Sequence, residues 1–227
     1  MPLSCANAVP AGCHPLSLPL SEADVRAQRI GDAVQLTGRL FTARDAVHRY
    51  LAMGGRVDCN LEGAVIYHCG PVMVRQDGRW QVWAAGPTTS SREEHYMGDL
   101  IRKYRFRAVI GKGGMGESTL AAMAEVGCMY LHAVGGAAQV LAANIDEVEA
   151  VYGYEQFGAP EAVWQLQVRG FPAVVTMDSH GQSLHDSVAA ASRNALNRLL
   201  LESNRASPIL SAPFENPPES SQPKIAP

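Results

Sequence analysis

A strand, a glycine-rich loop, a helix and a second strand follow one another at residues 106–134, and this order constrains the fold most. An apolar run at 106–110 leads into the loop 111–116, and a helix is expected from the end of the loop to Gly127. Glycine suits a helix end because it adopts the left-handed conformation easily. With the apolar strand at 129–134, the segment predicts a parallel βαβ unit and an α/β fold.

Periodicity predicts further elements on both sides of this unit. Strands are expected at 33–40, 64–68, 80–85 and 173–178, and helices from Ser21, over 43–53, from 93 to about 102, after Gly136 and over 186–203. The turn Asp77-Gly78 precedes the strand at 80–85. We expect a weakly ordered leader over 1–19, one domain over 20–205 and a disordered Pro- and Ser-rich tail over 206–227.

Composition excludes several classes of protein. A chain of 227 residues with 47% hydrophobic residues can bury one substantial core. The net charge of −3 offers no basic face for nucleic acid, and no apolar run reaches the roughly 20 residues that span a bilayer. The cysteines are odd in number and form no CxxC pair: Cys5, Cys13, Cys59, Cys69 and Cys128. We therefore expect no disulfide framework, no zinc site and a reducing, cytoplasmic location.

The loop Gly111-Lys112-Gly113-Gly114-Met115-Gly116 satisfies G-x-G-x-x-G after a strand and before a helix. That context is typical of a dinucleotide-binding turn, but the next strand ends near His132 without the expected acid. Backbone N–H groups, the helix N-terminus and Lys112 could instead bind a small anion. An ordinary tight turn with an exposed lysine is the third alternative.

Two other segments carry polar groups in suggestive order. The turn 86–92 holds several hydroxyls, of which Ser90 or Ser91 could cap the following helix. Arg92 is unusual in an acid-preferring first turn and could hold an anion. In the segment 42–48, an Asp45–His48 contact beside a solvated Arg44 is the simple interpretation. The histidines share no metal-ligand spacing, and no G-x-S-x-G elbow indicates a hydrolase.

Taken together, TARDAVH at 42–48, GPTTSSR at 86–92 and GKGGMG at 111–116 resemble one family. They are similar to the β portion of class I, iron–sulfur-dependent fumarases and L(+)-tartrate dehydratases. Four flanking sequence segments also resemble that family: VQLTGRLFTARD, GAVIYHCGP, EAVW and FPAVVTMDSHG. The likeness covers about residues 20–185.

The resemblance implies a swivelling β/β/α domain and a reaction that adds water to, or removes it from, a C4 dicarboxylate. It implies a [4Fe–4S] cluster held by three cysteines of a separate α subunit. This chain would then be the β subunit of a hetero-oligomer and would bind no cluster alone. Fumarate hydratase is the first expectation and tartrate dehydratase the close alternative. A nicotinamide-dependent oxidoreductase and a non-enzymatic binding domain are more distant ones.

The resemblance also assigns roles to residues. Arg44, Arg92 and Lys112 would hold the substrate carboxylates, and Thr88 would supply a catalytic hydroxyl. Supporting roles would fall to Asp45 and His48, which would position Arg44, and to Gly111, Gly113 and Gly114 of the loop. The chain departs from the family at Glu93, where a methionine is more common.

Overall fold

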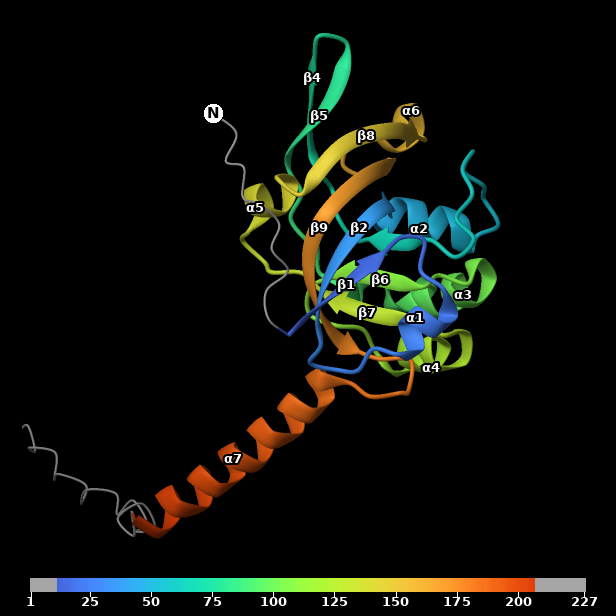
Figure 1. Ribbon diagram of the computed structural model, residues 1–227. Coiled ribbons are helices and arrows are strands. Elements are labelled where there is room, and N and C mark those ends of the chain that lie inside the picture. The colour runs from blue at the N-terminus through green and yellow to red at the C-terminus, as the bar shows by residue number, and fades with distance from the viewer. Residues whose placement is uncertain (1–11, 207–227) are drawn as a thin grey trace, which may run out of the picture. The chain divides into compact units, whose positions relative to one another are not determined.

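The computed structural model describes residues 12–206 (Figure 1). The strands are β1 (Cys13–Ser17), β2 (Ala33–Thr42), β3 (Val65–Tyr67), β4 (Val72–Gln76), β5 (Arg79–Ala84), β6 (Ala108–Gly111), β7 (Met129–His132), β8 (Ile145–Tyr152) and β9 (Val163–Met177). The helices are α1 (Glu22–Arg26), α2 (Asp45–Ala52), the 3-10 helix η1 (Ser90–Glu93), α3 (Glu94–Tyr104), α4 (Glu117–Val126), α5 (Ala138–Ala142), α6 (Tyr154–Phe157) and α7 (Leu184–Ala206). In this part of the chain, no helix combines the length and apolarity that crossing a membrane requires.

A small mixed barrel of five strands forms the centre of the fold. Strands β2, β3, β6 and β7 are parallel neighbours in that order, and β9 runs antiparallel to both β7 and β2, which closes the ring. The outer strands β1 and β8 extend β2 and β9 beyond the ring. The βαβ unit predicted from the glycine loop is present as β6, α4 and β7, and its two strands are parallel as expected.

The short parallel strands are buried on both faces. On β3, Val65 and Tyr67 belong to one hydrophobic cluster, whereas Ile66 belongs to another. The first cluster includes Phe171 of β9 and fills the barrel, while the second includes Met97 of α3 and packs the helices against it. Helices α2, α3 and α4 cover the same side of the barrel (Figure 1). Side chains that alternate between two buried layers explain why these strands read as continuous apolar runs.

Strands β4 and β5 form a separate antiparallel hairpin. Its turn is Asp77-Gly78, where both residues have positive φ, at 51° and 78°. Two consecutive positive φ values match a tight hairpin turn, which an aspartate followed by glycine favours. The predicted turn is therefore confirmed, and the hairpin projects from the barrel beside β8 (Figure 1).

The leader is ordered earlier than expected. Residues 13–17 form β1, which pairs in parallel with Ala33–Thr37, and the side chain of Leu16 on this strand is buried. The expectation of weak order over the whole of 1–19 is thus wrong for β1. Backbone pairing with β2 orders this strand, although Pro15 interrupts the alternating pattern that would have predicted it. Residues 1–11 and 207–227, and with them nearly all of the expected tail, lie outside the described residues.

By contacts the chain divides into two units, Met1–Ser187 and Val188–Pro227. The first is a mixed α/β domain that contains the barrel. Of the second, the described residues continue α7 to Ala206. The helix expected at 186–203 is therefore confirmed.

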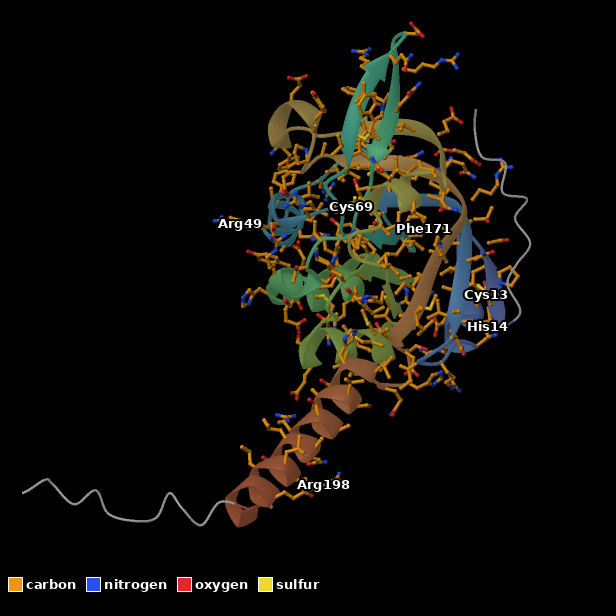
Figure 2. All side chains as sticks on the ribbon, turned by 90° about the vertical axis from the view of Figure 1, so that its left-hand side faces the viewer. Cys13, His14, Arg49, Cys69, Phe171 and Arg198 are labelled. Carbon is orange, nitrogen blue, oxygen red and sulfur yellow. The ribbon has the colours of Figure 1, made fainter. Side chains whose placement is uncertain are left out.

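Figure 2 shows Cys69 and Phe171 inside the packed first unit, with Arg49 at its surface.

Candidate active site

The candidate residues follow the carboxyl ends of parallel strands. Arg44 comes two residues after β2, His68 directly after β3 and Lys112 directly after β6. Because β2, β3, β6 and β7 are parallel, these ends meet at one end of the barrel. Ligands of α/β proteins commonly bind at such an end.

The turn 86–92 is tied to this end of the barrel by backbone hydrogen bonds. Lys112 N donates to the Thr88 carbonyl at 3.2 Å, and Ser90 N donates to the Lys112 carbonyl at 3.0 Å. The pairing is a parallel bridge between Thr89 and Lys112. The two motifs, distant in sequence, thus lie side by side at one isolated bridge.

Thr88 is held by the strand end beside it. Both its backbone N–H, at 2.7 Å, and its Oγ1, at 3.0 Å, donate to the carbonyl oxygen of His68. The hydroxyl proton is therefore occupied within the protein, and the remaining lone pairs of Oγ1 are available to a ligand.

Arg44 is the N-cap residue of α2 and has an extended backbone conformation. Its guanidinium lies close to Gly70. Its Nε lies 3.4 Å from Glu161 Oε1, and Glu161 Oε2 accepts a 3.0 Å bond from Ala46 N. A Cβ added at Gly70 would lie 2.5 Å from an Arg44 guanidinium nitrogen. Glycine at position 70 thus makes room for the guanidinium, and Glu161 orients it.

Arg92 lies on η1 and is half-exposed. Its Nη2 is 3.4 Å from Asp45 Oδ2. The expected Asp45–His48 contact is wrong, because the Nδ1 of His48 bonds Glu93 at 2.9 Å instead. By its ion pair, Asp45 orients Arg92, and the carboxylate that faces Arg44 belongs to Glu161.

Lys112 forms no ion pair with any carboxylate between residues 12 and 206. Its stem passes Gly135, where an added Cβ would lie 3.7 Å from the Lys112 Cδ. In the described part of the chain no carboxylate is therefore paired with Lys112, whereas Arg92 is paired with Asp45 and Arg44 with Glu161.

The glycine loop serves the fold in a way that the sequence did not suggest. Gly113 and Gly114 have φ of 84° and 76°, which L-residues rarely adopt. Glu94 of α3 accepts hydrogen bonds from Gly116 N at 2.7 Å, from Thr119 N at 3.2 Å and from the Thr119 hydroxyl at 2.7 Å. The N-terminus of α4, for which binding of an external anion was one of the alternatives, is thus occupied by a carboxylate of the chain itself.

A cluster of buried polar side chains lies beneath the turn, and sequence reasoning missed it. The members, all fully buried, are His48, His68, Ser90, Glu93 and Tyr130, which we call the polar cluster. Ser90 Oγ lies 2.8 Å from both His68 Nδ1 and the Tyr130 hydroxyl. The expectation that Ser90 or Ser91 caps the following helix is wrong, because the N-cap residues of η1 and α3 are Thr89 and Glu93. The one signal in the sequence was Glu93, an acid that directly follows Arg92.

Burial dominates the chemistry of the polar cluster. It holds the pKa of His68 well below the ordinary value of 6.5, and the neighbouring His48 and Arg92 lower it further. Burial also raises the pKa of Tyr130 to about 12, although its bond to Ser90 opposes the shift. His68 is therefore neutral at physiological pH, and Tyr130 keeps its proton.

The described cysteines do not fit an iron–sulfur cluster. Burial raises the pKa of Cys59 to about 11, that of Cys69 to about 12 and that of Cys128 still further. Cluster ligands are thiolates, and within residues 12–206 no three His, Cys, Asp or Glu side chains are grouped as a metal site would need.

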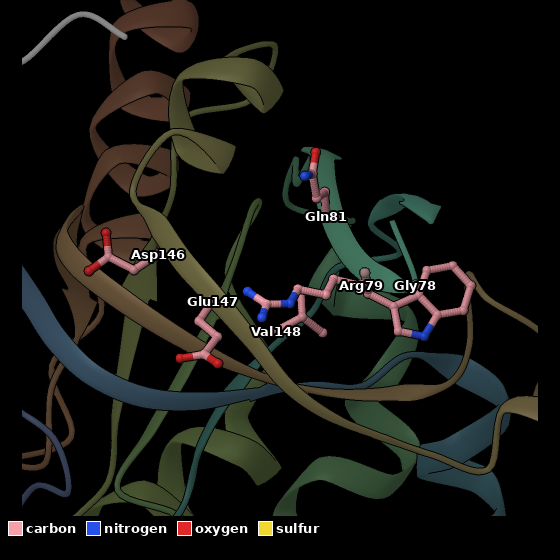
Figure 3. A pocket seen from close by; sticks show the side chains of 7 residues that line it. Gly78, Arg79, Gln81, Asp146, Glu147 and Val148 are labelled. Carbon is pink, nitrogen blue, oxygen red and sulfur yellow. The ribbon is translucent and has the colours of Figure 1, made fainter. Parts of the chain in front are cut away.

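A groove of about 720 Å³ lies between β5 and β8. Figure 3 shows Arg79 and Gln81 on one side and Asp146, Glu147 and Val148 on the other. None of the residues that line it belongs to the motifs at the end of the barrel, so the groove is separate from the candidate site.

Comparison with known proteins identifies the family. Residues 14–188 match the family described as Fumarase C-terminus. The chain is 51% identical over 184 residues to a putative fumarate hydratase class I of Geobacillus stearothermophilus, which covers 81% of this chain but 35% of that protein. The chain thus spans about a third of that relative.

Two shorter relatives are covered almost completely. A putative L(+)-tartrate dehydratase subunit beta of Methanocaldococcus jannaschii is 37% identical over 80% of this chain and 95% of its own length. The L(+)-tartrate dehydratase subunit beta of Escherichia coli K12 is 36% identical over 74% of this chain and 85% of its own length. The chain therefore belongs to the fumarase C-terminal family of hydro-lyases, which includes class I fumarate hydratase and the β subunit of L(+)-tartrate dehydratase.

Proposed function

We propose that this chain is the β subunit of a hydro-lyase that interconverts fumarate and malate. The observation that carries the proposal is the position of Arg44, Thr88, Arg92 and Lys112, which all belong to segments joined at the carboxyl end of β2, β3 and β6. A C4 dicarboxylate carries two negative charges, and three cations there could neutralise and orient both.

The cations would act mainly on the transition state. Removing the proton next to a carboxylate of malate places additional negative charge on that carboxylate. Guanidinium and ammonium groups already held near that position stabilise this charge without reorganising, which lowers the barrier more than it strengthens ground-state binding. Lys112 contributes most in this scheme because no carboxylate of the described chain neutralises it.

Thr88 would exchange the proton at its Oγ1. The hydroxyl donates to the His68 carbonyl, so its lone pairs are available to hydrogen-bond a ligand. A threonine hydroxyl is a weak base by itself. To act as the base, Oγ1 would first give its own proton to a proton acceptor of the assembled site and become an alkoxide that the nearby cations stabilise. It would then take the proton from the substrate carbon and become a neutral hydroxyl again.

The rest of the proposal concerns a partner. The first relative is about three times as long as the matched segment, and the shorter relatives are named as β subunits. We propose that an α subunit holds the [4Fe–4S] cluster, which the thiols described above do not fit, and completes the site in a hetero-oligomer. In that assembly this chain would act as a swivelling domain that presents its cations to the cluster.

L(+)-tartrate dehydratase is the second candidate, favoured by the names and lengths of the shorter relatives. The cations of this chain would bind the carboxylates of either substrate. They do not distinguish how many hydroxyl groups stand on the carbons between the two carboxylates. A dinucleotide-dependent oxidoreductase is disfavoured, because Glu94 already bonds the N–H groups that a pyrophosphate would need.

The test is turnover by the chain assembled anaerobically with its α subunit. We expect wild-type enzyme to hydrate fumarate with a higher kcat/KM than it shows for dehydrating L(+)-tartrate; the reverse order would select the second candidate. Lys112→Met should lower fumarate kcat/KM by roughly 30-fold or more, as for loss of a desolvated charge contact. The matched control is Lys103→Met, an exposed lysine on α3. Equal kinetics in both variants would remove Lys112 from the site.

A further inference from the structure

The polar cluster connects the elements that carry the candidate residues. His48 comes from α2, His68 follows β3, Ser90 and Glu93 belong to η1, and Tyr130 lies on β7. Ser90 stands between Thr88 and Arg92 in the chain, two residues from each. A bond that fixes Ser90 therefore fixes the turn on which both of those side chains depend.

In the His68 tautomer that is protonated at Nε2, the hydrogen bonds at Ser90 run in one direction. The Tyr130 hydroxyl donates to Ser90 Oγ at 2.8 Å. A serine hydroxyl has one proton of its own, and the acceptor within reach is Nδ1 of neutral His68, also at 2.8 Å. The chain of bonds runs from Tyr130 through Ser90 to His68, whose carbonyl in turn accepts from Thr88.

Tyr130 reaches this position because of Gly111. A Cβ at residue 111 would lie 2.9 Å from the Tyr130 hydroxyl and would overlap Ser90 Oγ. The tyrosine hydroxyl thus passes directly beneath the glycine that precedes Lys112. One buried hydroxyl therefore adjoins both the loop that carries Lys112 and the turn that carries Thr88 and Arg92.

We propose that Tyr130 is a positioning residue that sets the geometry of Thr88 and Arg92 through Ser90. The role rests on the proposed function of the site. Tyr130 contacts no substrate in this scheme. It acts from β7, a strand in the closed barrel, so that the turn adopts its reactive geometry before substrate arrives and without reorganisation.

The kinetic test uses Tyr130→Phe, which removes only the hydroxyl, in the enzyme assembled with its α subunit. We expect kcat for malate dehydration to fall about tenfold, the effect of losing one hydrogen bond of positioning, while the KM changes much less. In a Thr88→Ala background the same substitution should lower kcat by about threefold at most, because only Arg92 then remains to be positioned. Full, additive loss in that background would overturn the proposal.

The control is Tyr152→Phe, which also removes a tyrosine hydroxyl bond, that between β8 and Gln165 of β9. It should leave kcat unchanged. If Tyr130→Phe fails to fold, Ser90→Ala removes the same link with a smaller change and carries the same expectations.

Amide hydrogen exchange on the chain itself supplies a readout that does not depend on activity. We expect residues 86–93 and 111–116 to exchange about fivefold faster or more in Tyr130→Phe, while residues 145–152 remain as in wild type. Unchanged exchange at 86–93 would overturn the positioning role. If the wild-type assembly shows no hydro-lyase turnover, the proposed function fails, and exchange alone still decides whether Tyr130 holds the turn.

Discussion

At the scale of single residues, two buried histidines have different hydrogen-bond partners. His48 is paired with the carboxylate of Glu93, whereas His68 faces a serine hydroxyl and has its pKa lowered by burial, His48 and Arg92. The rings lie 5.0 Å apart in an edge-on arrangement. Protonating His68 would place a positive charge among groups that cannot compensate it, so this side chain is a sensitive probe of the polar cluster.

The stability of the chain should therefore fall as the solution is acidified. Below the ordinary pKa of 6.5 the unfolded chain binds a proton at His68 that the folded chain does not bind. The free energy of unfolding should decrease by about 1 kcal/mol between pH 6.5 and about pH 5.5 through this one group. Urea unfolding at a series of pH values measures the slope.

The comparison variant is His68→Asn, which retains a polar atom for Ser90 and removes the titration. Its slope over that pH interval should be shallower than wild type by about one proton. The exposed His95, changed to Asn, is the matched control for the loss of a histidine. A His68→Asn slope identical to wild type would mean that His68 titrates normally in the folded chain.

At the scale of elements, α3 and α4 are joined through Glu94. Its carboxylate accepts two backbone N–H bonds and one hydroxyl bond at the start of α4, where the helix dipole is positive. Glu94→Ala should lower the free energy of unfolding by about 1–2 kcal/mol, because the donors at the start of α4 lose their partner. Equilibrium denaturation measures the loss. Glu117→Ala, an exposed acid in the same first turn, should change stability by less than about 0.5 kcal/mol; equal losses would mean that Glu94 is no cap.

Some elements could be predicted and others could not, for physical reasons. The unit β6–α4–β7 was predictable because apolar runs and Gly127 mark its limits. Strand β8 was missed because it carries Asp146, Glu147 and Glu149, two of which pair with arginines of β2 and β9. The first half of β9 was missed because Gly170 and Pro172 read as a break, although the strand continues through them.

The candidate site was predictable in its motifs and unpredictable in its partners. Each of the four candidate residues lies in a recognisable sequence motif, so the sequence alone could name them: Arg44, Thr88, Arg92 and Lys112. Which acid faces which arginine depends on the barrel. Glu161 reaches Arg44 from the loop before β9, and Asp45 turns toward Arg92. No spacing in the sequence encodes such contacts.

At the scale of the whole molecule, the chain should not assemble an iron–sulfur cluster alone. Burial raises the pKa of the Cys59, Cys69 and Cys128 thiols, and no three metal-ligating side chains are grouped between residues 12 and 206. Purified chain incubated anaerobically with iron and sulfide, then desalted, should show no cluster absorbance, whereas the assembly with its α subunit should show it. A retained, coloured cluster on the isolated chain would contradict the assignment of the cluster to the partner.

The carboxylate of Glu94 also changes how a familiar signature should be interpreted. A tethered group acts at a high effective concentration, of order millimolar or above for short connections. Any phosphate that diffuses to the start of α4 meets an intramolecular competitor that is always present. The glycine pattern of this loop thus describes a turn that is already self-ligated, and searches that equate the pattern with nucleotide cofactors will misassign proteins built this way.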